Sequence, residues 1–342
     1  MNKRVLALGI ASILMLGLAA CGAKEEAKPV SGASASPKSA GTSPSPSASP
    51  SVSPSAASTA PRSISYLGKS YTVPGQTDKI VISGSLESME DALVLGVKPL
   101  GAITVGGKFP SLFDKITDGV TGVGEKTQPS LETILKLKPD IILSSTKFPA
   151  ETAEKFAKIA TTIPVSHIST DWEANLNLLA ELTGKQEQAK KALQTYKDDL
   201  KAVKEKIAPV IKEKEVLAVR VRTGNLFVYP EDVFFNPSLY AELGATVPAE
   251  VKQAKAQQQI SMEKLTEINP DYLFIQFSED ENKDTPKALD DLKNNPIFKS
   301  VNAVKNGNLY VNLVDPLTQG GTAYSKIAFL DALKKITFNQ AK

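Results

Sequence analysis

The chain of 342 residues is poor in the side chains that most often bind metals or carry out covalent catalysis. It has one histidine, His167, one cysteine, Cys21, and one tryptophan. The His-rich clusters of zinc or manganese sites therefore cannot be assembled, and we expect no metal site, cofactor or catalytic residue. A Ser-His-acid triad would have to use His167, and no GxSxG motif surrounds a candidate nucleophile. A hydrolase that uses a pair of carboxylates is the alternative from another class of function.

An excess of charge of one sign is also missing. The chain has 40 Lys and Arg residues against 37 Asp and Glu residues, which gives a formal net charge of +3. Nucleic-acid-binding domains usually carry a clear basic excess, so we expect no nucleic-acid partner. Any basic site in this protein must be a local cluster of side chains.

The apolar run near the N-terminus, residues 5–18, is too short to span a bilayer as a permanent helix. Two basic residues precede it, so residues 1–20 are typical of a secretory signal. Small residues then precede Cys21 in the sequence LAACG, which resembles the lipobox of bacterial lipoproteins. This resemblance implies that Cys21 carries a covalent lipid on the outer face of the cell membrane. An ordinary signal followed by a chance cysteine is the alternative.

Residues 21–62 contain few large apolar side chains and are rich in Ser, Pro and Ala, as in GTSPSPSASPSVSPSAAS. Such a segment cannot bury enough apolar surface to offset the entropy that ordering costs. We therefore expect an extended tether with partly polyproline-like character between the lipidated cysteine and the folded part.

Two similar stretches suggest an internal duplication. SLETILKLKPDIILSS begins at Ser130, and SMEKLTEINPDYLFIQFS begins at Ser261. Each has a Ser, a Glu two residues later, apolar residues at helical spacing, a Pro-Asp pair and a continuous apolar run. This pattern predicts a short helix that leads into a buried strand, once in each half of the folded chain.

Buried strands that are apolar on both faces are typical of parallel sheets covered by helices. The sequence therefore predicts the α/β class, with two Rossmann-like lobes of mainly parallel sheets at residues 63–171 and 209–342. Residues 172–208 are rich in helix formers and predict a long bridging helix, broken near Gly184, that limits the lobes to small hinge motions. Strands are expected at 79–84, 101–107, 140–145, 161–168, 215–222, 226–230, 271–277 and 307–313, with helices at 86–96 and 238–244.

Ligands of open α/β sheets bind beyond the carboxyl ends of the strands. Polar or basic side chains expected there or nearby are Lys108, Lys126, Ser144, Ser145, Lys147, Arg220, Arg222, Lys255, Gln257, Gln258 and Gln276. Arg220 and Arg222 are two residues apart on one strand, so both point to the same side. Two guanidinium groups there need anionic partners or a wet cleft, although a structural salt bridge is the alternative for one of them. His167 ends another strand and is expected to be structural or to line the cleft.

Longer strings of sequence carry a more specific resemblance. GSLESMEDALVLGVKPLGAI, STKFP, IPVSHIS and VDPLTQGGTAYSK resemble the substrate-binding proteins of iron-siderophore and vitamin B12 ABC importers. Within that family they are most similar to the binders of ferric catecholate siderophores such as bacillibactin. The resemblance implies a helical-backbone periplasmic-binding-protein fold, a monomer, and delivery of the iron chelate to ABC permease subunits. Ferric hydroxamate, ferric citrate or a tetrapyrrole is the alternative ligand.

The resemblance also implies roles for particular residues. It assigns ligand binding to Lys126, Lys147, Arg220, Arg222, Lys255, Gln257 and Gln258, with Lys108, Ser144, Ser145, His167 and Gln276 as further candidates. A ferric tris-catecholate carries a charge near −3, so cations from both lobes would attract it. Glu132 and Glu263, the repeated glutamates, would contact arginines of the permease. Alternatively, each glutamate only complements the dipole of the helix that it begins.

Overall fold

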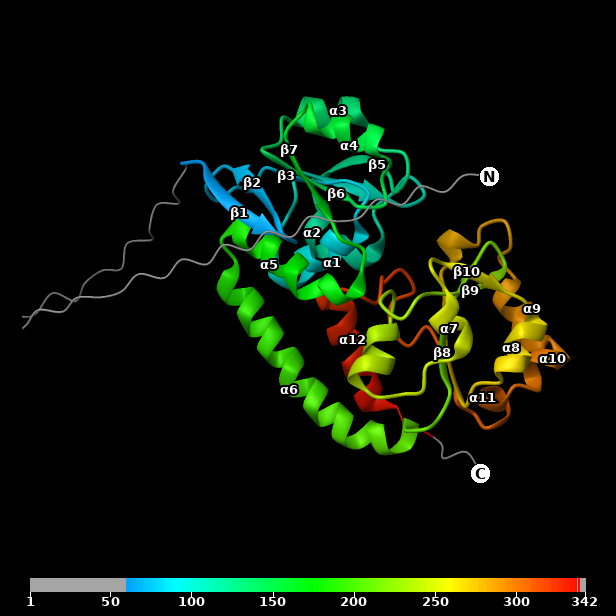
Figure 1. Cartoon of the computed structure of the whole chain (residues 1–342). Coiled ribbons are helices and arrows are strands. Elements are labelled where there is room, and N and C mark those ends of the chain that lie inside the picture. Colours follow the sequence, from blue (N-terminus) through cyan, green and yellow to red (C-terminus); the bar gives the residue numbers. More distant parts are fainter. Residues whose placement is uncertain (1–59, 337, 339–342) are drawn as a thin grey trace, which may run out of the picture. The chain divides into compact units, whose positions relative to one another are not determined.

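The computed structural model describes residues 60–336 and residue 338 (Figure 1). The predicted signal peptide, the predicted lipidation site Cys21 and the tether before residue 60 lie outside the described residues. The first strand begins at Arg62, which is the last residue of the predicted tether. The described residues belong to one compact unit, Ser55–Lys342.

The first lobe contains a hairpin and a parallel five-stranded sheet. The hairpin pairs β1 (Arg62–Tyr66) with β2 (Lys69–Val73) in antiparallel fashion. The sheet has the order β5-β4-β3-β6-β7, and its neighbouring strands are parallel. Its strands are β3 (Ile80–Ile82), β4 (Gly101–Thr104), β5 (Thr121–Glu125), β6 (Ile141–Ser145) and β7 (Thr161–Val165). Its helices are α1 (Leu86–Leu95), α2 (Asp114–Thr117), α3 (Leu131–Leu137) and α4 (Ala150–Ala157), with a 3-10 turn at Ser111–Phe113.

The second lobe contains a mixed sheet with the order β10-β9-β8-β11-β12. Strands β8, β11 and β12 are parallel, whereas β9 runs antiparallel to β8 and β10. These strands are β8 (Val216–Arg222), β9 (Asn225–Val228), β10 (Gln258–Ile260), β11 (Tyr272–Phe277) and β12 (Leu309–Val311). The helical segments are Ser238–Glu242, which is π-helical, α7 (Ala249–Gln253), α8 (Met262–Ile268), Glu279–Glu281, α9 (Ala288–Asn294), α10 (Pro296–Lys299) and α11 (Asn302–Lys305). The α/β class and the two mainly parallel sheets are confirmed.

Both faces of the first sheet are buried, as its continuous apolar strands predict. On β3, Ile80 and Ile82 belong to the large core cluster, whereas Val81 belongs to a smaller cluster on the opposite face. On β6, Leu143 belongs to the large cluster and Ile142 to the smaller one. Alternate residues of a strand point to opposite faces, so helices must cover the sheet on both sides.

The duplicated stretches adopt the same local structure. Ser130 and Ser261 cap α3 and α8, because each side chain accepts a hydrogen bond from the backbone N–H three residues later. Each helix ends in a left-handed residue, Lys138 at φ 51° and Asn269 at φ 47°. The strands that follow, β6 and β11, both lie inside their sheets with a parallel neighbour on either side.

The segment between the lobes forms two helices, α5 (Trp172–Thr183) and α6 (Gln186–Ile211), and Gly184 caps the first of them in a left-handed conformation. Helix α6 ends beyond the predicted bridge, and it packs against the C-terminal helix α12 (Ala323–Lys335) (Figure 1). Helix α12 also packs against α1 and α5, although its residues were expected to belong to the second lobe alone. The chain therefore joins the lobes through α6 and braces them with α12.

A buried lysine fixes α12 in this position. Lys326 Nζ lies 2.9 Å from Ser238 Oγ and 2.9 Å from Glu242 Oε1, and it faces the rings of Trp172 and Tyr196. The ammonium group is therefore paired with a carboxylate and also makes cation–π contacts with α5 and α6.

Candidate functional site

A cleft of about 660 Å³ lies beyond the carboxyl ends of strands from both lobes. The first lobe contributes residues that follow β3, β5, β6 and β7, and the second contributes the end of β8 and the loops around β9 and β10. Its lining residues are Glu87, Lys126, Lys147, His167, Ile168, Arg220, Arg222, Tyr229, Pro230, Asp232, Val233, Phe234, Ala254, Lys255, Ala256, Gln257 and Gln319. The structure thus brings together five of the predicted basic side chains, and both arginines point to the same side.

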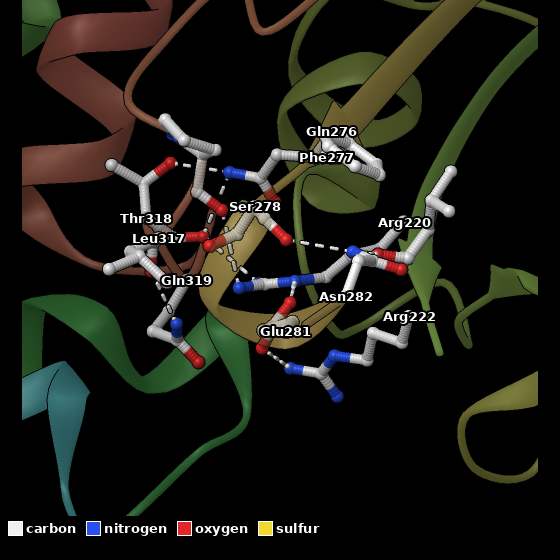
Figure 2. A network of polar contacts seen from close by, with 12 residues as sticks. Arg220, Arg222, Gln276, Phe277, Ser278, Glu281, Asn282, Leu317, Thr318 and Gln319 are labelled. Atoms are coloured by element: carbon white, nitrogen blue, oxygen red, sulfur yellow. Dashed lines mark hydrogen bonds and ion pairs between the residues drawn. The ribbon is translucent and has the colours of Figure 1, made fainter. Parts of the chain in front are cut away.

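Glu281 joins the two arginines (Figure 2). Its Oε2 atom accepts a hydrogen bond from Arg220 Nε at 2.7 Å, and its Oε1 atom accepts one from Arg222 Nη2 at 2.8 Å. Burial opposes the charge of this carboxylate, but the two guanidinium groups lower the pKa of Glu281 below its ordinary value. Glu281 is therefore an anion within the cationic site.

Arg220 has both a structural and an electrostatic role. It is 2% exposed, and its Nη1 and Nη2 atoms donate to the backbone carbonyls of Thr318 and Pro316, each at 3.3 Å. With Nε on Glu281, every nitrogen of this guanidinium already has a partner. Arg222 is more exposed, so it can turn toward a ligand, while Arg220 contributes its positive charge from beneath.

Lys147 forms an ion pair with Glu87, whose carboxylate is nearly inaccessible to solvent. Lys147 Nζ lies 2.8 Å from Glu87 Oε1, while Glu87 Oε2 is buried with no hydrogen-bond partner among the described residues. Burial raises the energy of the charged carboxylate, but Lys147 and then Lys126 outweigh it and lower the pKa of Glu87. The first lobe therefore also places an anion beside its cations.

Lys126 lies close to three other positively charged side chains, Lys147, Arg220 and Arg222. Its Nζ donates to Gln319 Oε1 at 3.4 Å, near the upper limit of a hydrogen bond. Burial and the nearby charges of Lys147, Arg222 and Arg220 lower the pKa of Lys126 to about 7, although Glu87 acts in the opposite direction. An anion in the cleft would restore the charged form of this amine.

The loop before β10 completes the second lobe's side of the cleft. Lys255 is exposed there, and Gln257 Oε1 accepts hydrogen bonds from Arg222 Nη1 at 2.6 Å and from the Tyr229 hydroxyl at 3.1 Å. Because the oxygen of Gln257 is already an acceptor, its amide nitrogen is left to donate to a ligand.

His167 lines the cleft, as one of its two predicted roles required. Its Nδ1 atom lies 2.8 Å from Thr146 Oγ1, and burial followed by the nearby charge of Lys147 lowers the pKa of His167. The imidazole is therefore neutral at pH 7 and adds no charge to the site.

Two predicted ligand residues lie outside the cleft because of local backbone geometry. Gln258 follows Gln257 in extended backbone, so its side chain points to the opposite side, and it is not among the lining residues. Lys108 belongs to a tight turn in which the Val105 N–H bonds the Lys108 carbonyl, and its side chain is exposed outside the cleft. Neither side chain lines the cleft in this structure.

Three polar residues of the central strands are buried in the lobes and do not line the cleft. Ser144 is 1% exposed, and Ser145 Oγ accepts a hydrogen bond from the Lys147 N–H. Gln276 donates to the Asp315 carbonyl and to both oxygens of Thr318. These residues shape the loops beneath the cleft, because their strands are buried on both faces.

Sequence reasoning missed four polar residues of the site, namely Glu87, Asp232, Glu281 and Gln319. Glu87 lies in the first turn of the helix after β3, and a search of every strand end for acidic residues would have found it. Glu281 is distant in sequence from the arginines, so only the tertiary structure places it between them.

Glu132 and Glu263 lie away from the cleft, in the first turns of α3 and α8. Both are exposed. Glu132 forms an ion pair with Lys136 at 2.6 Å. The carboxylate of Glu263 accepts a hydrogen bond from the Glu263 backbone N–H and one from the Ser261 side chain, and these lower the pKa of Glu263. Both carboxylates are thus available to a partner, and the docking role stays a prediction.

Within residues 60–336 and residue 338, no group of three His, Cys, Asp or Glu side chains is placed to hold a metal ion. Over the same described stretch, no helix combines the length and the apolar character needed to cross a membrane.

Two α/β lobes that enclose a cationic cleft define a solute-binding protein, and the comparisons with known proteins agree. The periplasmic binding protein family model matches residues 81–312, so the chain belongs to this family. It is 50% identical over 328 residues to the iron-uptake system-binding protein of Bacillus subtilis, and the match covers 96% of each chain. The crystal structure of the triscatecholate siderophore binding protein FeuA from Bacillus subtilis, complexed with ferri-bacillibactin, superposes with a TM-score of 0.77 at 56% identity, covering 80% of this chain and 96% of that one. The petrobactin-binding protein YclQ of Bacillus subtilis shares the fold at 21% identity, with a TM-score of 0.69 over 80% of this chain and 97% of that one.

Proposed function

We propose that this protein binds a ferric catecholate siderophore outside the cell and delivers it to an ABC permease for iron uptake. The observation that carries the proposal is the convergence of lysine and arginine side chains from both lobes in one cleft. The resemblance to FeuA, a triscatecholate siderophore binding protein by its published description, supports the same ligand class. The protein acts as a binding protein and performs no reaction on the chelate.

The charge of the cleft suits a compact trianion. Lys126, Lys147, Arg222 and Lys255 face the space, and Arg220 adds its charge from below. Each lobe holds one of its basic groups with a carboxylate, so these cations are fixed in place before the ligand arrives. A ferric tris-catecholate would gain a strong attraction from this preorganised cationic surface, whereas a ferric hydroxamate, which is closer to neutral, would gain little from it.

Intrinsic fluorescence can test this proposal, because the chain contains one tryptophan and Tyr229 lines the cleft. Purified protein should be titrated with ferric tris-catecholate, a ferric hydroxamate, ferric citrate, haem and cobalamin while intrinsic fluorescence is recorded. We expect saturable quenching with ferric tris-catecholate, and affinity at least about a hundredfold weaker for the hydroxamate, from two or more lost ion pairs. Equal affinity for all five ligands, or no binding of the catecholate, would overturn the proposal.

We assign contact with the permease to Glu132 and Glu263. They are exposed at the same position of two duplicated helices, so a pair of permease subunits would meet two similar acidic groups. Arginine is the cation that best matches a carboxylate in such a contact. We further assign lipid attachment to Cys21 and action as a monomer on the outer face of the cell membrane.

A further inference from the structure

The loop between β12 and α12 crosses the seam between the two lobes. On the second-lobe side, the Thr318 carbonyl accepts hydrogen bonds from Arg220 Nη1 at 3.3 Å and from Gln276 Nε2 at 3.1 Å (Figure 2). On the first-lobe side, the Gln319 backbone N–H donates to Oε1 of Glu90, on α1, at 2.7 Å. Adjacent residues of the loop are thus bound to opposite lobes.

Glu90 makes this attachment strong because it is completely buried and accepts several hydrogen bonds. The hydroxyl groups of Thr322 and Ser325 both donate to its Oε2 atom, while Oε1 is taken by the Gln319 N–H. A buried carboxylate with donors on both oxygens holds its partners in a narrow range of positions.

The two glycines that follow Gln319 fix the backbone further. Gly320 has φ 81°, and a Cβ atom there would lie 2.6 Å from the carbonyl carbon of Phe234, which lines the cleft. A Cβ atom on Gly321 would lie 1.8 Å from Ser169 Oγ. The loop therefore lies directly against the cleft wall, as close as only glycine at these two positions allows.

The side chain of Gln319 is the part of this loop that faces the cleft. Its Nε2 atom donates to the Leu317 carbonyl at 2.6 Å, and its Oε1 atom accepts from Lys126 Nζ at 3.4 Å. A neutral amide at that distance is a weak partner for an ammonium group, so an anionic ligand oxygen would take its place.

We propose that Gln319 is a positioning residue of the cleft, which holds Lys126 of the first lobe toward the ligand space and releases it to an anionic iron chelate. The inference rests on the proposed function and adds a residue outside the predicted ligand set. Because the Gln319 backbone is bound to Glu90 and its neighbour to Arg220, this weak contact favours one position of Lys126 relative to the arginines of the other lobe. The distance between Lys126 and the arginines of the second lobe is then already suited to the chelate before it binds.

Two substitutions of Gln319 test the contact with ferric tris-catecholate as the probe. Gln319→Glu places a carboxylate against Lys126 and the incoming trianion, so affinity should fall about tenfold or more. Gln319→Met keeps the length but removes the acceptor, and affinity should fall about two- to tenfold, because Lys126 is no longer held toward the ligand space before the ligand arrives. The control Gln188→Glu makes the same charge change on an exposed position of α6 outside the cleft. An equal loss in the control would overturn the inference.

A double-mutant cycle separates positioning from a general structural effect. In a Lys126→Met background, Gln319→Met should change affinity by less than about twofold, because the side chain that Gln319 positions is gone. The same loss with and without Lys126 would show that Gln319 acts on the fold or on the ligand in another way, and would overturn the inference.

A measurement on the free protein distinguishes failure of this inference from failure of the proposed function. The side-chain NMR signal of Lys126, assigned by its disappearance in Lys126→Met, should titrate at a higher pH in Gln319→Glu than in the wild type. An unchanged midpoint would overturn the contact between the two side chains. If the midpoint is shifted in Gln319→Glu but the wild-type protein fails to bind ferric tris-catecholate, the contact is supported, whereas the proposed function and the release of Lys126 to that ligand are overturned.

Discussion

Glu281 Oε2 accepts a hydrogen bond from Arg220 Nε at 2.7 Å, and this pair lies beneath the cationic cleft. The second oxygen of the same carboxylate holds Arg222 at 2.8 Å. One partly buried anion thus orients two cations that differ in exposure, with Arg220 almost fully enclosed and Arg222 partly open to the cleft. The two arginines should therefore respond differently to the same substitution.

Arg220→Gln should mainly destabilise the protein. The change leaves the Pro316 carbonyl without its donor, removes one of the two donors of the Thr318 carbonyl and takes one cation from the partly buried Glu281, so we expect a loss of about 3 kcal/mol in the free energy of unfolding. Urea unfolding followed by circular dichroism measures this directly. Full stability in Arg220→Gln would contradict the structural role given to this side chain.

Arg222→Gln is the matched change on the same strand, and it should mainly weaken ligand binding. Its guanidinium is partly exposed, so the unfolding free energy should fall by no more than about 1 kcal/mol. Affinity for ferric tris-catecholate should fall about tenfold with the loss of one charge-assisted contact. Unchanged affinity, measured by fluorescence titration at low salt, would remove Arg222 from the ligand contacts.

Ligand affinity should depend on pH through Lys126. Its pKa of about 7 in the free protein means that it is charged below pH 7 and loses its charge above it. A trianionic ligand favours the charged form and raises this pKa, so the contribution of Lys126 is complete below about pH 7 and falls by up to about tenfold per pH unit above it.

The comparison with Lys126→Met cancels the pH dependence of the iron chelate itself. The ratio of wild-type to mutant affinity should be constant on the acidic side and should decline as pH rises from about 7 to 9. His167 does not interfere in that interval, because its pKa is lowered from its ordinary value and it is neutral throughout. A flat ratio would show that Lys126 is charged in the free cleft at all these pH values.

Glu132→Gln and Glu263→Gln should separate docking from helix capping. Both side chains lie outside the cleft, so the purified double mutant should bind ferric tris-catecholate as tightly as the wild type. Uptake of iron from the chelate by cells should nevertheless fall, most of all in the double mutant, because charged contacts to the permease are lost. Normal uptake by a stably folded double mutant would leave these glutamates with a role in their helices alone.

Cys21→Ala should release the protein from the cell without changing its ligand affinity. A long Ser- and Pro-rich segment separates Cys21 from the cleft residues in the sequence, so we expect the substitution to leave the cleft unchanged. Immunoblots of membrane and medium fractions, from cells that lack the permease, measure the distribution. Retention of Cys21→Ala on the membrane would contradict lipid attachment at this residue.

The strand ends and the basic side chains that follow them could be predicted from the sequence. Strands such as Ile141–Ser145 form continuous apolar runs, and a parallel sheet gathers the residues after such runs at one edge. That rule correctly brought Lys126, Lys147 and Arg222 into one cleft. It carries no information on side-chain direction within irregular loops, which is why it included Lys108, whose turn points it into solvent.

The anions and the seam between the lobes could not be predicted in the same way. Glu281 acquires its role from Arg220, which is distant in sequence within the second lobe, and Gln319 acquires its role from Lys126 of the first lobe. The pattern of alternating helices and strands did not predict the antiparallel strand Gln258–Ile260. The direction of the Gln258 side chain could therefore not be predicted either. Helix α12 shows the same limit, because its packing against α1 depends on the path of the whole chain.

The central claim is that cations of both lobes bind an iron chelate without a protein ligand on the metal. A crystal structure of the complex with ferric tris-catecholate tests it most directly. The account predicts the chelate in the cleft, with Lys126, Lys147 and Arg222 within hydrogen-bond distance of its oxygens and all six iron ligands supplied by catechol. A chelate bound elsewhere, or iron coordinated by His167 or Glu87, would contradict it.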